Sequence, residues 1–352
     1  MQLMKVSIGT KIKEGPWGGG NLFAINLKNY LVDSGHKVVH DLADDDIDII
    51  LITEPRKTSE SSAFTDRDVK KYRDFVNNDV LIIHRINECD ERKGTNYVNK
   101  YLIEANKVAD ETVYVSKWIQ DLYMQQGINS TKNVIYAGAN SEIFNSKNFV
   151  PWDGLSKISI VTHHWGGNWN KGFETYSHLD RLIESKKWKD KIEFTYIGNL
   201  PPNFEFNNTN VVKPLSGKKL SNLIKESHLY ITGSINEPSG NHHIEAAQCG
   251  LPILYLKSGG TSEYCKDFGI GFEKNNFETK LELIIENYDQ IVKKMQNYPH
   301  NANKMSKEYL TLFETMKKNK ANYLGLRINK KVSLISKKIH LNSRAIKKKI
   351  KF

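Results

Sequence analysis

Two glutamates on either side of a predicted helix start are the residues of this sequence best suited to chemistry. Glu237 and Glu245 stand in the stretch NEPSGNHHIEAAQCGLPILYLKSGGTSEY, which covers residues 236–264. The segment LYITGS before them predicts a strand, and HHIEAAQC predicts a short helix that Ser239 or Asn241 can cap. The two carboxylates would then flank the backbone amides at the start of that helix.

Binding of a nucleotide sugar is the chemistry that fits this arrangement. The amides of residues 239–242 would form a helix N-terminus, which attracts phosphate through its unpaired N–H groups and its dipole. A carboxylate repels phosphate, but it accepts two hydrogen bonds from the neighbouring hydroxyls of a sugar or a ribose. One glutamate for each polyol, with amides between them, therefore predicts a nucleotide-diphosphate sugar. The alternative is that both are ordinary surface glutamates near a helix start.

The same stretch resembles the E-x7-E region of the retaining family-four glycosyltransferases, which have the GT-B fold. The resemblance implies an α/β protein with two doubly wound, Rossmann-like domains that face each other across a cleft. It implies that Glu237 lies at the donor sugar and that Glu245 binds the ribose of the nucleotide. It also places the residues at the helix start in the donor site: Ser239, Gly240, Asn241 and His242.

Three further segments carry the resemblance, one of which is VIYAGANSEIF, similar to an inter-domain element of the family in which Asn140 is the matching polar residue. PWGGGNLFAINLKNYLVDSGHKV resembles the glycine-rich loop of the N-terminal domain, where Gly18 and Gly19 let the backbone approach a phosphate or an acceptor. THHWGGNWNKGFETY resembles the opening of the donor domain, and Lys171 matches the lysine that contacts the diphosphate. The family usually has an arginine shortly before this lysine, where this chain has Gly166. The alternatives for its role are His163, His164, Asn168 and Asn170.

Another polar segment, LIIHRINECDERKG, predicts the acceptor side of the site. It follows a predicted strand, and α/β proteins bind ligands at the carboxyl ends of their strands. Related enzymes often place a histidine or an aspartate near the donor sugar from this side, so His84 is a catalytic candidate. Asp90, Asn87 and Arg92 are candidates for acceptor contacts. The alternative is a solvated loop held by salt bridges.

A metal site is not implied by the sequence. The adjacent histidines at 163–164 and at 242–243 diverge in a strand or a helix instead of converging on one ion. Asp44 and Asp46 precede a strand and predict a solvated turn. We therefore expect no cofactor other than the nucleotide-diphosphate sugar, which is a co-substrate.

Strands that alternate with helices predict parallel βαβ units in two series. The first series has MKVSIG, DIDIILIT, DVLIIHR and TVYVS, and the second has KISIVTH, IEFTYIG, HLYITGS and LPILYL. We expect an N-terminal acceptor-side domain over 1–150 and a C-terminal donor domain with closing helices over 151–324. A basic amphipathic tail over 325–352 follows.

The net positive charge of the chain is concentrated toward its C-terminal end. The sequence has 51 Lys and Arg against 40 Asp and Glu, and 13 of the basic residues but no acidic residue lie in 315–352. The rest of the chain is nearly neutral, which argues against nucleic acid as a partner. Three distant cysteines predict reduced thiols and a cytoplasmic protein.

Together these patterns predict a retaining, metal-independent hexosyltransferase that acts on a saccharide or a lipid-linked acceptor. Lys171 and the helix amides would stabilise charge on the leaving diphosphate while Glu237 positions the donor sugar. Two alternatives remain. A nucleotide-sugar epimerase of the same fold would convert the donor without transfer, and a non-catalytic nucleotide- or glycan-binding module would do neither.

The tail carries a separate prediction. Apolar residues recur there at intervals of three, four or seven: Ile328, Val332, Ile335, Ile339, Ile346 and Ile350. This spacing predicts one helical face flanked by lysines, which suits peripheral binding of residues 328–352 to an anionic membrane at its inner face. The alternative is a disordered, Lys-rich terminus with incidental isoleucines.

Deletion of 329–352 should therefore abolish sedimentation with anionic liposomes and leave donor binding intact. High salt should mimic part of the deletion, because screening removes the electrostatic share of the attraction. Full-length protein that ignores anionic liposomes even at low salt would show the membrane role to be wrong.

Overall fold

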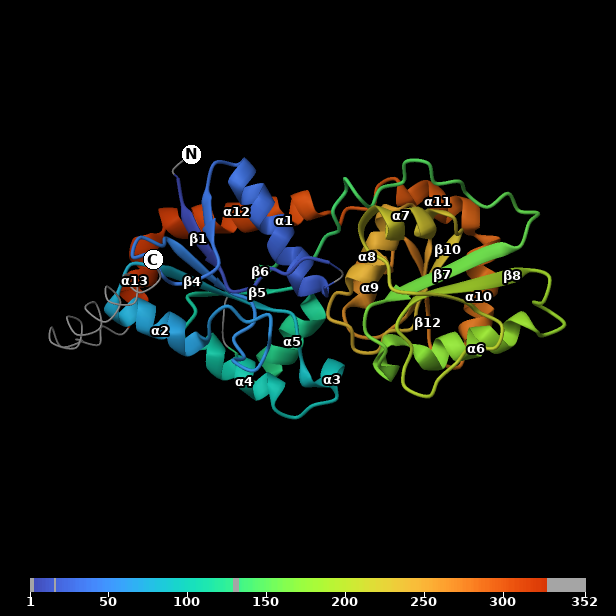
Figure 1. Ribbon diagram of the computed structural model, residues 1–352, viewed down its shortest axis with the longest axis horizontal. Coiled ribbons are helices and arrows are strands. Elements are labelled where there is room, and N and C mark those ends of the chain that lie inside the picture. Colours follow the sequence, from blue (N-terminus) through green and yellow to red (C-terminus); the bar gives the residue numbers. More distant parts are fainter. Residues whose placement is uncertain (1–2, 16, 129–132, 328–352) are drawn as a thin grey trace.

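The computed structural model of the chain describes residues 3–15, 17–128 and 133–327. Two six-stranded parallel sheets form the framework of these residues, and helices cover both faces of each sheet (Figure 1). The strand order is β2-β1-β3-β4-β5-β6 in the first sheet and β12-β11-β10-β7-β8-β9 in the second. The predicted α/β architecture of two doubly wound domains is thus confirmed.

The N-terminal domain is built on the first sheet. Its strands are β1 (Lys5–Ile8), β2 (Lys37–Val39), β3 (Ile49–Ile52), β4 (Leu81–Ile86), β5 (Glu111–Tyr114) and β6 (Asn133–Val134). Its helices are α1 (Gly19–Asp33), α2 (Asp66–Phe75), α3 (Asp90–Lys93), α4 (Val98–Asn106) and α5 (Lys117–Gln125).

The C-terminal domain is built on the second sheet. Its strands are β7 (Ile158–His164), β8 (Ile192–Gly198), β9 (Asn210–Val212), β10 (Leu229–Thr232), β11 (Ile253–Leu256) and β12 (Gly269–Phe272). A 3-10 helix, η1 (Trp169–Lys171), follows β7. The helices are α6 (Phe173–Ile183), α7 (Gly217–Lys225), α8 (Asn241–Gln248), α9 (Thr261–Cys265), α10 (Phe277–Glu286) and α11 (Tyr288–Met295). The described chain ends with α12 (Ala302–Lys318) and α13 (Lys320–Leu326).

The eight predicted strands are the eight interior strands of the two sheets. Each is covered by helices above and below, so it is an apolar run that stands out in the sequence. The strands without a prediction are the edge strands β2, β6, β9 and β12. They have two to four residues, and most of their side chains are partly exposed, so their sequences carry little hydrophobic pattern.

Helix α12 returns from the C-terminal domain to the first sheet. It lies beside α1 over that sheet (Figure 1), and the rings of Phe23 and Tyr309 meet edge to face at 5.2 Å. Its side chains in the N-terminal core are Met305, Tyr309, Leu310, Phe313 and Met316. These residues fall within the range predicted for the donor domain, 151–324, but their packing makes them part of the N-terminal core.

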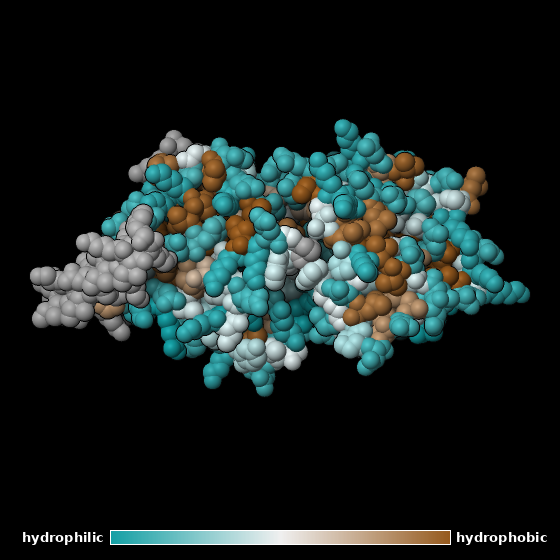
Figure 2. All heavy atoms as spheres, in the orientation of Figure 1, coloured by the Kyte–Doolittle hydropathy of each residue, from teal (hydrophilic) through white to brown (hydrophobic). Residues whose placement is uncertain are grey.

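No helix among the described residues is both long enough and apolar enough to cross a membrane. The predicted amphipathic face at 328–352 lies outside the described residues. The face of the molecule seen in Figure 2 is mostly hydrophilic, with apolar patches over both domains and an indentation between them.

Replacement of Phe313 by Ala should destabilise the N-terminal domain although the residue lies far along the chain from it. Phe313 is 0% exposed, and removal of a buried phenylalanine side chain costs about 3–5 kcal/mol. Urea unfolding should show this loss in the transition of the N-terminal domain. Leu326→Ala is the matched control because Leu326 is 84% exposed. An unchanged N-terminal transition in Phe313→Ala would contradict the assignment of α12 to that core.

Candidate active site at the domain interface

Two glycines bring the loops after β7 and β10 into contact. These strands are neighbours in the second sheet, so their loops leave its carboxyl edge side by side. Gly172 has φ +108, and a Cβ there would lie 2.5 Å from the backbone carbon of Gly233. A side chain at Gly172 would force the loops apart. The glycine after Lys171 therefore lets this lysine reach the loop that carries Glu237.

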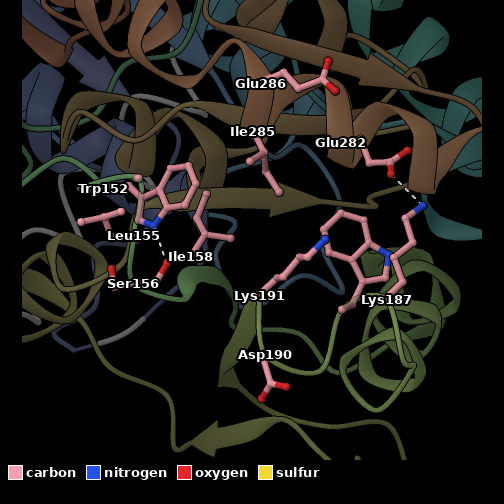
Figure 3. A pocket seen from close by; sticks show the side chains of 12 residues that line it. Trp152, Leu155, Ser156, Ile158, Lys187, Asp190, Lys191, Glu282, Ile285 and Glu286 are labelled. Atoms are coloured by element: carbon pink, nitrogen blue, oxygen red, sulfur yellow. Dashed lines mark hydrogen bonds and ion pairs between the residues drawn. The ribbon is translucent and has the colours of Figure 1, made fainter.

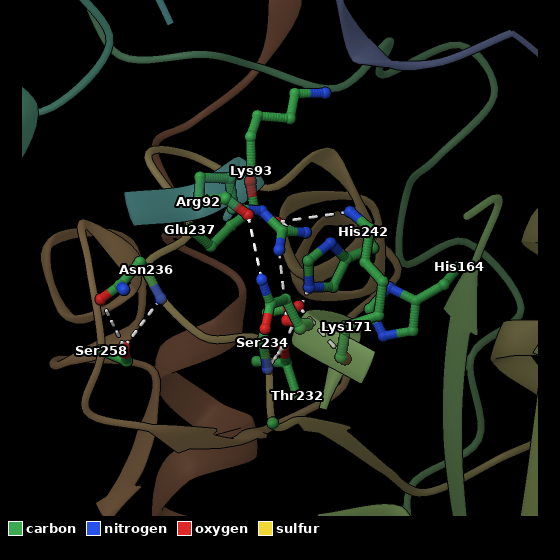
Figure 4. Close-up of polar contacts among 12 residues, drawn as sticks. Arg92, Lys93, His164, Lys171, Thr232, Ser234, Asn236, Glu237, His242 and Ser258 are labelled. Carbon is green, nitrogen blue, oxygen red and sulfur yellow. Dashed lines mark hydrogen bonds and ion pairs between the residues drawn. The ribbon is translucent and has the colours of Figure 1, made fainter. Parts of the chain in front are cut away.

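The carboxylate of Glu237 is shared by cations from both domains (Figure 4). Its Oε2 lies 2.9 Å from a guanidinium nitrogen of Arg92, which belongs to α3 of the N-terminal domain. The same oxygen lies 3.5 Å from Nζ of Lys171. Glu237 is only 8% exposed, and this burial by itself would raise its pKa. The two cations more than offset that effect and lower the pKa of Glu237 to about 2, so the carboxylate is ionised.

The segment that presents Glu237 is held in a strained conformation. Asn236 has a φ of +50, which is uncommon for a residue other than glycine. Its backbone N–H donates to Oγ of Ser258 at 2.8 Å, and its side-chain amide donates to the carbonyl oxygen of Glu91 at 3.1 Å. The second bond crosses to the N-terminal domain. Such a strained conformation persists only where surrounding contacts fix it, and conformations of this kind are concentrated at functional sites.

Helix α8 begins at this site without a side-chain cap. Its N-cap is Gly240, so the prediction that Ser239 or Asn241 caps the helix was wrong. Gly240 has φ +73, and a Cβ there would lie 2.6 Å from the His243 ring, so the imidazole fills the space beside the turn. Within the part of the chain that the structure describes, the N-cap thus gives the amides at the helix start no side-chain partner.

The glycine-rich loop meets the start of α8 across the interface. Gly18 is the N-cap of α1, and a Cβ on Gly19 would lie 3.1 Å from the side chain of Asn241. The N-termini of α1 and α8 therefore converge from opposite domains. Two helix N-termini pointing at one place favour a negatively charged ligand there.

Glu245 lies one turn into α8 and is tied to the end of β7. Its Oε2 lies 2.9 Å from Nε2 of His163, whose Nδ1 lies 3.2 Å from the hydroxyl of Tyr230. Glu245 is buried, so this contact fixes its side chain. His163 was one of the alternatives for the role of the family arginine, and the structure pairs it with a carboxylate instead.

The remaining histidines of the two pairs are buried and partly bonded. His164 bonds Tyr176 at 2.6 Å and His242 bonds Thr232 at 2.9 Å, while neither nitrogen of His243 has a partner among the described residues. Burial lowers the pKa of His164 and His242 well below the ordinary value and that of His243 to about 3. In the described part of the chain, no three His, Cys, Asp or Glu side chains are placed to hold a metal ion.

The acceptor-side candidates do not all reach the site. His84 is buried in β4, where its Nδ1 bonds Asn106 at 2.9 Å and burial lowers its pKa to about 4. Among the described residues, no hydrogen bond or ion pair joins it to Glu237. Asn87 is half-buried just after β4. Asp90 accepts backbone N–H bonds from Val98 and other residues at the start of α4, so it organises its own loop.

Arg92 is the acceptor-side candidate that the structure brings to Glu237.

Glu263 is a contact residue that no pattern in the sequence indicated. Glu263, in α9, accepts the backbone N–H groups of Lys117 and Trp118 at 2.7 Å each. It thereby caps α5 of the other domain. No sequence signal connects these residues, because 145 positions separate Trp118 from its partner.

A separate pocket of about 360 Å³ lies at the opposite end of the second sheet (Figure 3). Trp152 and Trp188 line it together with Ile158 at the start of β7 and Lys191 just before β8. The pocket is thus at the amino ends of the strands and shares no residue with the cluster around Glu237. The ion cluster and the two converging helix starts favour the interface as the active site.

The fold is that of the GT-B glycosyltransferases. Residues 203–305 match the family of glycosyl transferases group 1, a segment that contains Glu237 and Glu245 but neither Lys171 nor Arg92. Comparison of the sequence with curated proteins gives no significant match.

Three solved structures illustrate the likeness. A glycosyltransferase from Rickettsia africae has a TM-score of 0.61 and 14% identity, over 91% of this chain and 100% of that one. Sucrose-phosphate synthase from Thermosynechococcus elongatus has a TM-score of 0.62 and 12% identity, over 90% and 100%. HepE from Anabaena, in complex with UDP and glucose, has a TM-score of 0.59 and 15% identity, over 90% and 99%.

The low pKa of Glu237 predicts a pH-dependent stability. Replacement by Gln leaves the buried Arg92 and the half-buried Lys171 without their carboxylate and should cost about 3–5 kcal/mol at neutral pH. Glu237 stays ionised in the folded protein down to about pH 2, whereas in the unfolded chain it takes up a proton near 4.5. Its contribution is therefore present at neutral pH and is lost as the pH falls from about 4.5 toward 2, by up to ~3 kcal/mol.

Urea unfolding between pH 3 and 7 gives the free energy of unfolding of Glu237→Gln and of the unmodified protein. The difference between the two free energies should become smaller as the pH falls toward 3. The control is Glu104→Gln, which breaks only the exposed pair with Lys107 and should change stability by less than about 1 kcal/mol throughout. A free-energy difference that stays constant with pH would show that folding does not lower the pKa of Glu237.

Proposed function

We propose that the protein is a retaining glycosyltransferase that moves a sugar from a nucleotide-diphosphate sugar to a hydroxyl of a saccharide or lipid-linked acceptor. The observation that carries this proposal is the buried, ionised Glu237 beside Lys171, in the loop before α8, where the two domains meet. The match with glycosyl transferases group 1 over residues 203–305 supports it. The UDP and glucose held by HepE, which has the same fold, support a nucleotide-sugar donor.

The donor lies along α8 in this proposal. Glu245 binds the ribose hydroxyls through Oε1, because His163 holds Oε2. The amides of residues 239–242 and the cation of Lys171 take the diphosphate, and Glu237 positions the donor sugar. Each of the three parts of the donor thus has a group of matching chemistry within one helix and the loop before it.

Catalysis rests on stabilisation of charge. As the glycosidic bond loosens, negative charge grows on the leaving diphosphate, where Lys171 and the helix amides are already in place. The acceptor hydroxyl then attacks from the face that the diphosphate leaves and gives its proton to an oxygen of the leaving diphosphate, so that the anomeric configuration is retained. The charge is met by side chains and amides, and the reaction is metal-independent in this proposal.

The acceptor approaches from the N-terminal domain, whose α3 segment contacts the Glu237 loop. A lipid-linked acceptor agrees with the basic tail, which we propose to lie on an anionic membrane surface on the cytoplasmic side.

An epimerase of the same fold would change the donor sugar without an acceptor. Product analysis with and without acceptor therefore separates the two activities.

The test begins with a panel of nucleoside diphosphates and their 2′-deoxy counterparts, followed by donor-release and transfer assays with the matching nucleotide sugars. One nucleoside diphosphate should stabilise the protein against heat, and its 2′-deoxy form should bind about tenfold or more weakly, because it lacks a hydroxyl that a charged carboxylate accepts from. Glu245→Gln should reduce this preference for ribose and leave binding of inorganic pyrophosphate unchanged.

Glu193→Gln is the control, since Glu193 is an exposed carboxylate on β8 of the same domain. An unchanged preference for ribose in Glu245→Gln would remove this residue from the donor site. Absence of both nucleotide binding and sugar transfer across the panel would overturn the proposed function. Product of inverted anomeric configuration would overturn the retaining mechanism alone.

A further inference from the structure

We propose that Arg92, which comes from the N-terminal domain, binds the diphosphate of the donor together with Lys171, and that Glu237 occupies Arg92 while the site is empty. The ligand class is a diphosphate ester. The inference rests on the proposed function, because it assigns the group that completes the phosphate part of the donor site.

Arg92 is held at the interface by contacts that leave its charge directed at the site. One guanidinium nitrogen lies 2.9 Å from Oε2 of Glu237, and another donates to the backbone carbonyl of Asn170 at 3.2 Å. The side-chain amide of Asn170 donates back to the carbonyl oxygen of Arg92 at 3.3 Å. Asn170 directly precedes Lys171, so Arg92 docks on the very loop that carries the other cation.

The charges in this cluster do not balance. Arg92 and Lys171 both contact the single oxygen Oε2 of Glu237, so two cations share one carboxylate (Figure 4). Arg92 is 7% exposed, and Lys171 is buried enough that desolvation lowers its pKa. Glu88 is a second carboxylate whose charge acts on Lys171, but Lys93 pairs with it at 3.3 Å, so its negative charge is already matched by a cation. A buried excess of positive charge beside two helix N-termini favours an anion with more than one charge.

The donor-side loop between β7 and α6 supplies one cation, Lys171. Between the end of β7 and Lys171 the chain has no arginine, and Gly166 stands close to the lysine stem, with an added Cβ 3.6 Å from Cε of Lys171. His163 is bonded to Glu245, and Asn170 is bonded to Arg92 itself. An arginine that crosses the interface therefore supplies a planar, multiply donating group that the C-terminal domain lacks here.

In this proposal the diphosphate replaces Glu237 as the partner of Arg92, and Glu237 holds the arginine in position until the ligand binds. A diphosphate that enters between Arg92 and Lys171 offers charged oxygens to both cations, and it frees the Glu237 carboxylate to accept hydroxyl hydrogens of the sugar. Because Arg92 belongs to the other domain, this binding also couples the donor to the relative position of the two domains.

The test measures binding of inorganic pyrophosphate and of matched nucleoside mono- and diphosphates by calorimetry, with Arg92→Gln, Arg92→Lys and Glu237→Gln variants. Arg92→Gln should lower the preference for diphosphate over monophosphate about 10- to 100-fold, the range for charge-assisted hydrogen bonds, and Arg92→Lys should keep part of it. Glu237→Gln should bind pyrophosphate more tightly, because the competing carboxylate is gone. In the double variant, with both Glu237→Gln and Arg92→Gln, pyrophosphate should no longer bind more tightly than it does to the unmodified protein.

The control is Arg327→Gln, which removes an arginine paired with Asp110 at the amino end of β5, away from the interface. A diphosphate preference that survives in Arg92→Gln would overturn the inference and leave the proposed function standing. Equal losses for mono- and diphosphate, or no gain in Glu237→Gln, would reduce Arg92 to a structural contact between domains. A folded, unmodified protein that binds neither pyrophosphate nor any nucleoside diphosphate would overturn the proposed function as well.

Discussion

The ionised carboxylate of Glu237, buried between cations of two domains, is the interaction on which the site depends. A buried charge is tolerated only with partners close by, and here the partners are Lys171 from the same domain and Arg92 from the other. The position of one loop thus depends on the position of the opposite domain. The other contacts across the interface are arranged around this constraint.

Backbone geometry makes the ion cluster possible. Gly172 and Gly233 allow the loops after two neighbouring strands to touch, and Asn236 adopts a positive φ so that Glu237 turns toward the interface. Gly240 is the N-cap of α8, so this helix begins three residues after Glu237's loop neighbour Pro238 and has no side-chain cap. A parallel sheet brings such loops to one edge, and small residues then set how closely they approach.

The two domains are joined by more than the cluster. Glu263 caps α5 of the N-terminal domain, and α12 carries the chain back so that Phe313 and its neighbours complete the core under α1. These contacts join the two domains independently of the ion cluster. The helix starts of α1 and α8 can therefore face each other at a short distance, with Gly19 against Asn241.

The sequence by itself determined the interior of both sheets, whereas the donor-binding roles of Glu237, Glu245 and Lys171 stay a prediction. Apolar runs predicted the eight interior strands, and the residue pattern around Glu237, Glu245 and Lys171 predicted one site, because these features are local along the chain. Only the tertiary structure decided which distant residues meet. The edge strands, the return of α12 and the pairing of Arg92 with Glu237 depend on contacts between segments far apart in sequence, and such contacts leave no local pattern. The helix cap at Gly240 was mispredicted for a related reason, since two imidazole rings fill the space around the turn.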